Sequence, residues 1–340
     1  MKRHSGVLRR FKPRSIAAAF VTAAIVMAAA VTTGLAIAQQ NFPNRTVNLI
    51  VPWPAGSAMD LLARSLAAEL NSGWGHPVIV ENIPGAGSII GAQKAANAAP
   101  DGHTLMITVN DTVVHNRFVH KNLPYDPDKS FVAVTMLARS GQFVLAHPKL
   151  EASTLQGLVE LAKRQPATLS FASFGNGTRP HVLFAAMNQR EGIDLLHVPY
   201  KGVGPAIAGV VGGEVHLSLA SPGQSGEMIR AGRLKPLALA AAERSKAFPG
   251  VPTVAEAGFP YLEAPLWFGL FAPAGTPPAV IERIHRDATA VLRRPDFAEK
   301  NVTARGFELV ASSPAQFAQA IGKDVAATAL MVRTAGLQLE

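Results

Sequence analysis

Three short segments rich in glycine, serine and proline contain the residue types that could hold an anion. Each follows a strand-like run and leads into a stretch with helical periodicity: PWPAGSAMD at 52–60, ENIPGAGSIIGAQKAA at 81–96 and SFGNGTRPHV at 173–182. The first N–H groups of a helix have no partner within the helix, and its N-terminus carries a partial positive charge. These loops therefore predict a site for a small carboxylate, held by backbone dipoles more than by side-chain charge.

In the first loop, a serine and an acid are spaced as in a capping box. Ser57 would be the N-cap of the following helix, and Asp60 would accept hydrogen bonds from first-turn N–H groups and make the loop rigid. Trp53 could form a wall of the site, although ordinary packing is the alternative. The predicted ligand-binding residues here are Trp53, Ala55, Gly56, Ser57 and Asp60.

The second loop has a glycine pattern close to that of a dinucleotide-binding turn. Its spacing is G-x-G-x-x-x-G, Pro84 lies where the tight turn would run, and no acid ends the next strand-like run, TLMITV. A nicotinamide or flavin site is therefore a poor fit. A glycine loop that opens a helix remains, with backbone donors at Gly87 and Ser88. The predicted binding residues are Gly85, Ala86, Gly87 and Ser88.

In the third loop, two glycines flank Asn176, and Thr178 could cap a helix with His181 in its first turn. A catalytic role for His181 would need a nucleophile, and no G-x-S-x-G elbow accompanies it. A polar residue of the site or a surface histidine is the expected role. Arg179 could clamp a carboxylate, or be a solvated arginine at a helix start. Binding residues are predicted at Gly175, Asn176, Gly177, Thr178, Arg179 and His181.

The sequence contains no constellation typical of catalysis. There is no metal-ligand spacing, no phosphate-binding loop and no nucleophile motif, and the absence of cysteine excludes disulfides, thiolate metal sites and a cysteine nucleophile. We therefore expect a binding protein without cofactor or metal. A secreted hydrolase or a dinucleotide enzyme that uses Asp60, Asp111 or His181 stays open as the alternative.

Strand-like and helix-like segments alternate along the chain, which favours an α/β fold with mainly parallel sheets. The segments 132–146 and 263–278 look like crossings between two domains. We expect one lobe from residues 41–139 with 268–340, a second from 140–267, and a ligand cleft between them. Helices are expected near residues 58–70, 90–98, 155–164, 180–190, 205–211, 223–231 and 279–292.

The N-terminus resembles a secretory signal. Six of the 32 Lys and Arg residues lie within the first 14 residues, an uncharged Ala/Val-rich run covers 15–38, and Ala36-Ile37-Ala38 is a small-x-small cleavage site. A signal peptide at 1–38 and a periplasmic protein are expected, with an uncleaved anchor as the alternative. The remaining 26 basic residues face 23 acids, a net charge of +3, so no nucleic-acid partner is expected.

Seven blocks in one order, from about residue 42 to 318, resemble the Bug family of receptors of tripartite tricarboxylate transporters. The blocks are VPWPAGSAMDLLARSLA, ENIPGAGSIIGAQKAANAAPDGHTL, LPYDPDKSFVAV, GNGTRPH, VPYKGVGPAI, ERSKAFPGVPTVAEAGFP and WFGLFAPAGTP. The resemblance implies a type II periplasmic binding-protein fold in which two first-lobe loops hold one carboxylate. It also implies a monomer that delivers its ligand to membrane permease subunits, or a ligand sensor for a two-component system.

The resemblance adds binding residues after TLMIT, where the chain offers Asn110, Thr112 and Asn116. After VHLSLA, family members often carry an aspartate, whereas this chain has Ala220 and Ser221. We count Ser221 among the binding residues. The missing aspartate disfavours an amine-bearing ligand, so the resemblance implies a di- or tricarboxylate or an aromatic carboxylate.

Overall fold

The computed structural model describes residues 42–337. The predicted signal peptide and its cleavage site lie outside these residues. No helix within the described range is both long enough and apolar enough to cross a membrane.

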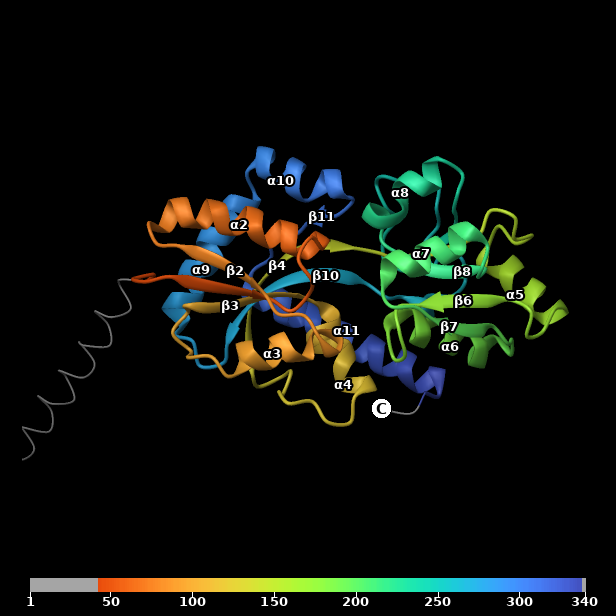
Figure 1. Ribbon diagram of the computed structural model, residues 1–340, viewed down its shortest axis with the longest axis horizontal. Helices are drawn as coiled ribbons and strands as arrows, with labels where there is room; N and C mark the ends of the chain where they lie inside the picture. The colour runs from red at the N-terminus through yellow and green to blue at the C-terminus, as the bar shows by residue number, and fades with distance from the viewer. Residues whose placement is uncertain (1–41, 338–340) are drawn as a thin grey trace, which may run out of the picture. The chain divides into compact units, whose positions relative to one another are not determined.

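The first of two sheets has six strands in the order β11-β4-β10-β3-β1-β2. Strand β1 pairs in parallel with β2 and β3, while β10 is antiparallel to both β3 and β4. Strands β1 to β4 therefore point the same way, and their carboxyl ends lie at one edge of the sheet (Figure 1). The bounds are β1 Val47–Val51, β2 Val78–Asn82, β3 Thr104–Val109, β4 Phe131–Ser140, β10 Leu266–Pro273 and β11 Glu308–Leu309.

Helices cover both faces of this sheet. Helices α2 and α9 contact one face, and α3 and α11 contact the other. Apolar residues on both faces bury the parallel strands, as their near-continuous apolar runs require. The bounds are α2 Ala58–Trp74, η1 Ala86–Ser88, α3 Ile89–Ala96, η2 Asp111–His115, α4 Asn116–Val119, α9 Pro278–Leu292, α10 Pro295–Asn301, η4 Thr303–Arg305 and α11 Pro314–Ala335.

The second sheet has the order β7-β6-β8-β5-β9. Strand β6 is parallel to β7 and β8, and β5 is antiparallel to β8 and β9. The strands are β5 Phe143–Ala146, β6 Ser170–Ser173, β7 Leu196–Pro199, β8 Leu217–Ala220 and β9 Lys235–Leu239. The helices around it are α5 Leu155–Arg164, α6 Arg179–Glu191, α7 Val203–Gly212, α8 Pro222–Arg230 and η3 Pro260–Leu262. We call the parts around the two sheets the first and second lobes.

Of the nine strand pairs formed within the described residues, only four are parallel, so the expectation of mainly parallel sheets was wrong. The reason lies in the crossings. Strand β10 returns from the second lobe against the direction of β3 and β4, and β5 enters the second sheet against β8. A chain that crosses between two sheets and returns introduces antiparallel pairs into both.

The segment 132–146, expected as one long strand, is two strands in different sheets. Strand β4 ends at Ser140 and β5 begins at Phe143. Between them, Gly141 packs so tightly that a Cβ would lie 2.7 Å from the Leu239 side chain. The first sheet thus extends to Ser140 and resumes at Leu266. The lobe boundaries at 139/140 and 267/268 stay a prediction.

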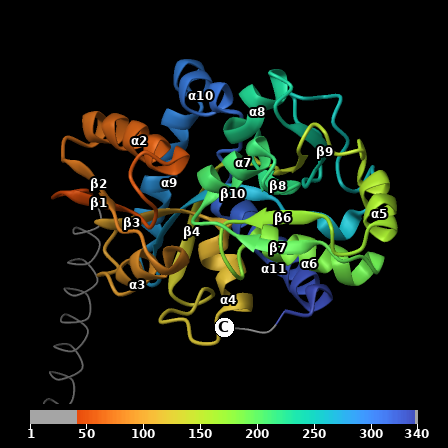
Figure 2. The same ribbon diagram turned by 45° about the vertical axis from the view of Figure 1, so that its right-hand side comes forward.

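Helix α11 connects the two lobes. It begins with a capping box in which Gln316 N–H and the Ser313 side chain bond each other. Phe317, near its start, lies in the core beside the first sheet, whereas Met331 and Ala335 lie in the core of the second lobe. Figure 2 shows its later turns beside α6. The C-terminal segment therefore does not belong to the first lobe alone.

The seven expected helices are present, with ends within a few residues of the expected positions except at Trp74, where α2 ends. The sequence pattern missed α4, α10, α11 and the turn η2. This turn has π-helical hydrogen bonding, which occurs mostly as single turns inside α-helices and is frequent at functional sites.

Candidate functional site

Every predicted site residue follows the carboxyl end of a strand that has a parallel neighbour in its sheet. The first loop follows β1, the second follows β2, and Asn110 and Thr112 follow β3. In the second lobe, the third loop follows β6 and Ser221 follows its parallel neighbour β8. Ligands of open α/β sheets bind outside the carboxyl ends of the strands, so the topology gathers the predicted residues at two such edges.

In the first loop, Asp60 holds the backbone. Its side chain is buried, and its carboxylate accepts hydrogen bonds from Gly56 N–H at 2.8 Å, Arg64 Nε at 3.0 Å and Asn82 Nδ2 at 2.9 Å. Burial would raise the pKa of this carboxyl, but the donors from Gly56, Arg64 and Asn82 outweigh it and place the pKa below the usual value. Asp60 therefore supports the loop, and its role in ligand binding stays a prediction.

The remaining features of the first loop fit a helix-start anion site. Ser57 accepts from Asp60 N–H at 3.2 Å, as the capping-box spacing predicts. Gly56 has a φ of 81°, which a left-handed turn requires, and its N–H is already bonded to Asp60. Donors toward a ligand must then come from neighbouring N–H groups such as that of Ala55, which lies exposed. Trp53 adds an indole Nε1 that is buried without a hydrogen-bond partner.

The second loop is strained. Gly85, Ala86, Gly87 and Ser88 all have positive φ, at 131°, 45°, 60° and 80°, although two of them are not glycine. Such residues persist only where their surroundings hold them, and they are frequent at ligand clamps. Here Asn116 Nδ2 donates to Gly87 O at 3.0 Å, and the Ser88 hydroxyl lies 2.7 Å from the Thr112 hydroxyl.

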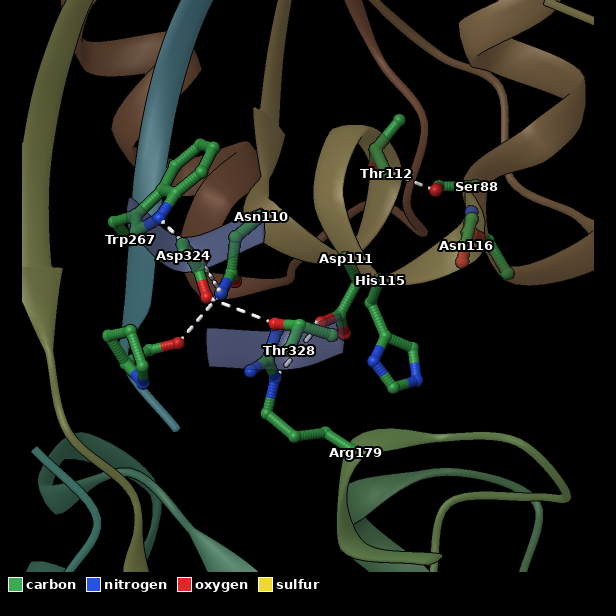
Figure 3. Close-up of polar contacts among 12 residues, drawn as sticks. Ser88, Asn110, Asp111, Thr112, His115, Asn116, Arg179, Trp267, Asp324 and Thr328 are labelled. Carbon is green, nitrogen blue, oxygen red and sulfur yellow. Dashed lines mark hydrogen bonds and ion pairs between the residues drawn. The ribbon is translucent and has the colours of Figure 1, made fainter. Parts of the chain in front are cut away.

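Two residues predicted after β3 have different roles. The Thr112 hydroxyl bonds those of Ser88 and Thr108, so it braces the second loop (Figure 3). Asn110 is fully buried, and its Nδ2 donates to Pro265 O at 2.7 Å and to Asp324 at 3.0 Å. Its Oδ1 has no partner.

Asp324, on α11, was not predicted. This buried carboxylate also accepts from Trp267 Nε1 at 3.0 Å and from the Thr328 hydroxyl at 3.2 Å. It therefore joins the end of β3, the returning strand β10 and the last long helix. No local sequence signal could have found it, because its partner Asn110 lies 214 positions away.

The two lobes contact each other at the turn η2. Arg179 Nε and Nη2 donate to Asp111 Oδ1 at 3.2 and 3.0 Å, and His115 Nε2 lies 2.5 Å from Gly177 O. Arg179 is only 4% exposed. The expectation of a solvated helix-start arginine was therefore wrong, and the carboxylate that Arg179 holds belongs to Asp111.

His115 was also not predicted. Burial lowers the pKa of its imidazole, so the ring is neutral near pH 7. Because Gly177 O can only accept, Nε2 carries the proton and Nδ1 is a bare acceptor. This Nδ1 is buried and has no partner.

In the third loop, the histidine builds the turn. His181 Nδ1 accepts from Gly177 N–H at 3.0 Å, and the Thr178 hydroxyl donates to Gly175 O at 2.6 Å instead of capping α6. The His181 ring stacks on His197 with centroids 3.9 Å apart. Burial, and then the neighbouring His181, lower the pKa of His197 to about 4. These bonds give His181 a structural role, and Asn176 is exposed at the tip.

Ser221 is the N-cap residue of α8. It is buried, and both its N–H and its hydroxyl lie 3.1 Å from Gln224 Oε1. Its polar groups are thus engaged within the second lobe, in line with a role in shaping the loop after β8.

Buried side-chain atoms without a hydrogen-bond partner gather around these strand ends. Four such atoms in the described part of the chain are Trp53 Nε1, Asn110 Oδ1, His115 Nδ1 and Gln142 Oε1. Trp53, Asn110 and Gln142 come one or two residues after β1, β3 and β4, which point the same way. Because native proteins rarely leave buried polar groups unpaired, these atoms are available to a ligand or to ordered water.

Two hollows elsewhere on the second lobe involve none of the predicted residues. One of about 580 Å³ is lined mainly by apolar side chains of α7 with Met228, and one of about 480 Å³ by residues that include His147 and His216. Between residues 42 and 337, no group of three or more His, Asp or Glu residues could hold a metal ion.

Comparisons with known proteins agree with this geometry. A family model described as "Tripartite tricarboxylate transporter family receptor" matches residues 62–337. Protein BugT of Bordetella pertussis is 33% identical over 312 residues, which cover 91% of this chain and 95% of that protein.

Three solved structures share the fold. The periplasmic binding protein BugD has a TM-score of 0.75 at 28% identity and covers 88% of this chain and 100% of its own. Rpa4515 of R. palustris, solved with adipate, has a TM-score of 0.78 at 29% identity and the same coverage. MatC from Rhodopseudomonas palustris, solved with malate, has a TM-score of 0.74 at 30% identity and covers 85% and 100%. The fold is therefore that of the periplasmic binding proteins, as expected.

Proposed function

The chain belongs to the family of tripartite tricarboxylate transporter receptors, and from this premise we propose that it captures a small carboxylate in the periplasm. It then delivers the ligand to the membrane permease subunits of such a transporter. The protein acts as a monomer. A signal peptide directs it to the periplasm and is cleaved after Ala38.

The observation that carries this proposal is the pair of helix-start loops at the carboxyl edge of the first sheet, beside an unpaired buried donor, Trp53 Nε1. The other unpaired buried atoms near these loops, Asn110 Oδ1 and His115 Nδ1, are acceptors and do not hold the carboxylate. A ligand held there meets backbone donors, as a carboxylate requires. The strained second loop, held from behind by Asn116, fits a preformed clamp.

The ligand class follows from the charge of the site and from the solved relatives. The two cations that contact the turn η2 are already paired, Arg179 with Asp111 and Arg117 with Asp128, which favours binding through dipoles. The relatives with adipate and malate bind small dicarboxylates. A di- or tricarboxylate or an aromatic carboxylate is the ligand we propose here.

The contacts of the ionisable groups favour a receptor without catalytic activity over an enzyme. The three candidates for an enzyme are Asp60, Asp111 and His181, and each is engaged in a bond that shapes a loop. A hydrolase of the common types needs a base within hydrogen-bond distance of a nucleophile, and none of these three side chains forms such a pair among the described residues.

A thermal-shift screen of mono-, di-, tri- and aromatic carboxylates tests the proposal. A ligand at 100 times its Kd raises the free energy of unfolding by about 2.7 kcal/mol. Calorimetry should then give a 1:1 complex from which the ligand is recovered unchanged. If no carboxylate stabilises the protein, or if the ligand is turned over, the proposal is wrong.

A pair of matched variants locates the site. Gly56 and Gly75 flank the same helix α2, both have positive φ, and an added Cβ would meet no atom within 4 Å at either position. Gly56→Val and Gly75→Val therefore impose similar backbone strain at opposite ends. We expect only Gly56→Val to lose carboxylate affinity, and circular dichroism should show that both variants fold.

A further inference from the structure

We infer that Gly223 and Gly306 are positioning residues that set the angle between the two lobes. They form a second contact between the lobes, separate from the one at the turn η2. The inference rests on the proposed function, because this angle affects binding only if the ligand lies between the lobes.

At this contact the backbones of the two lobes meet with no side chain between them. A Cβ on Gly223 would lie 2.1 Å from Arg305 O, and a Cβ on Gly306 would lie 2.7 Å from Gly223 N. Because carbon atoms that are not bonded pack at about 3.5–4.0 Å, neither position accepts a side chain unless the two backbones move apart.

On the first lobe, the turn that makes this contact is fixed to the first sheet. Gly306, with a φ of 78°, ends η4, and its N–H donates to Thr303 O at 2.9 Å. The next residue, Phe307, packs edge to face on Phe268 of β10 with ring centroids 4.8 Å apart. Glu308 then begins β11, which pairs with β4. The turn therefore cannot move without disturbing the first sheet.

On the second lobe, the start of α8 is fixed as well. Ser221 N–H donates to Gln224 Oε1 at 3.1 Å, and the Ser225 hydroxyl donates to Ser221 O at 2.9 Å. Pro222, the first residue of α8, is buried. Because Gly223 lies two residues after Ser221, a displacement of this helix start also displaces a predicted ligand-binding residue.

An ion pair next to this contact is too weak to set the angle by itself. Arg139 Nη2 lies 3.0 Å from Glu243 Oε2 of the second lobe, and Arg139 Nε lies 3.1 Å from Glu308 Oε2 of the first. The side chains of Arg139 and Glu243 are 47% and 71% exposed, and such pairs contribute little. The contact between the two backbones is therefore the stronger constraint on the angle.

Two glycines of the same helix provide the test and its matched control. Gly223→Ala and Gly226→Ala both replace a glycine of α8 by a better helix former. The added Cβ at position 226 would lie 3.3 Å from the Phe248 ring, which belongs to the same lobe. Only Gly223→Ala introduces a side chain between the lobes, so only this variant should change their angle.

The angle can be measured as a distance between two spin labels. The chain contains no cysteine, so Ala68→Cys on α2 and Lys163→Cys on α5, both at exposed positions, place one label on each lobe. With Gly223→Ala we expect a longer distance between the labels, with and without ligand. If about one tenth of the molecules still reach the binding angle, the apparent Kd rises about tenfold. The Kd is measured by calorimetry with succinate, malate and adipate.

The two readings separate the inference from the function on which it rests. A label distance equal to that of Gly226→Ala would overturn the inference, whatever the Kd. A longer distance with an unchanged Kd would also overturn it, because the angle would then not matter for binding. If none of the three carboxylates binds the unaltered protein, the proposed function fails, and the label distance alone decides whether the glycines set the angle.

A second pair of variants keeps the test valid if Gly223→Ala does not fold, as judged by circular dichroism. Gly306→Ala adds a Cβ on the other side of the same contact and should also lengthen the label distance. Gly232→Ala is its control, since Gly232 has a similar φ of 67° and an added Cβ would meet no atom within 4 Å. Equal label distances in these two variants would contradict the inference.

Discussion

The turn that begins α2 and the turn that follows β3 occupy equivalent places in the first sheet but differ in how their polar atoms are used. In the first, the Asp60 carboxylate collects three donors and leaves no acceptor idle. In the second, Asn110 and His115 each keep one buried acceptor unpaired. We call the first turn saturated because its buried acceptors are all bonded, and the second open; the unpaired atom of the first loop, Trp53 Nε1, is a donor.

The difference separates two tasks. Backbone N–H groups bind an anion only if the loop that presents them is fixed. In a site that binds through backbone dipoles, the side chains therefore form hydrogen bonds within the loop. Selection among ligands needs side-chain atoms that the protein leaves free. Under the proposed function, the saturated turn would provide affinity for any carboxylate, and the open turn would distinguish between carboxylates.

Asp60→Asn should produce the largest effect, because it breaks the saturated turn. An amide offers one oxygen where the carboxylate serves three donors, and its NH₂ group would face one of them. Since an unpaired buried group costs about 1–3 kcal/mol, we expect a loss of about 2 kcal/mol in the free energy of unfolding. Urea denaturation measures it. Glu243→Gln, which alters an exposed ion pair, is the control and should change little. A loss no larger than that of the control would show that the turn does not depend on Asp60.

The stability of the protein should depend on pH through His197, which stacks on His181 of the third loop. The pKa of His197 is about 4 in the folded protein, against about 6.5 in the unfolded chain. Between these values the unfolded chain binds more protons, so stability falls as the pH falls from about 6.5 to 4. The ring is only half buried, and after allowance for solvent screening we expect a contribution of about 1–2 kcal/mol.

His197→Phe is the variant for this measurement, because the new ring can still stack on His181 and Phe171. Urea denaturation between pH 7.5 and pH 5 should show that the free energy of unfolding depends less steeply on pH than in the unaltered protein. Some slope should persist, since burial also lowers the pKa of His115 and His216. An unchanged slope would contradict the assignment to His197.

The fold and the loops could be predicted because their signals are local. Ser57 and Asp60 are three residues apart, the glycines of the second and third loops are adjacent to their helices, and each block is continuous in the chain. Capping and turn formation depend on such neighbours, so the helix starts were found within a few residues.

The partners of the open turn could not be predicted, because they come from distant parts of the chain. Arg179 meets Asp111 across 68 positions, and Asp324 meets Asn110 across 214. Neither pair has a periodicity or spacing that marks it. For this reason Arg179 was expected at the surface or on the ligand, and His115 and Asp324 were not expected at the site at all.

The contact between the lobes at the open turn should have a smaller energy. Arg179 is buried, but the Asp111 side chain is 29% exposed, so screening limits the pair to a coupling of about 1 kcal/mol. A double-mutant cycle with Asp111→Asn and Arg179→Met, read as ligand affinity, isolates it. We expect the double variant to lose less than the sum of the single variants. Strict additivity would mean that the pair does not contribute to the bound state.

The smallest effect concerns the strained second loop, and it has opposite signs in stability and binding. Ala86 has a φ of 45° and is exposed, so Ala86→Gly relieves strain without opening a cavity. The relief exceeds the added freedom of the unfolded chain by only a little, and we expect a gain of about 0.5 kcal/mol in the free energy of unfolding. Ligand affinity should fall by about twofold to fivefold, because glycine also lets the unliganded loop leave the binding conformation.

Gly87→Ala is the reverse change at the next position, where φ is 60° and a Cβ meets no atom within 4 Å. It should cost stability and leave the loop at least as rigid. If Ala86→Gly gains stability and keeps its full affinity, the strain is not part of the clamp, and the turn after β2 only connects a strand to a helix.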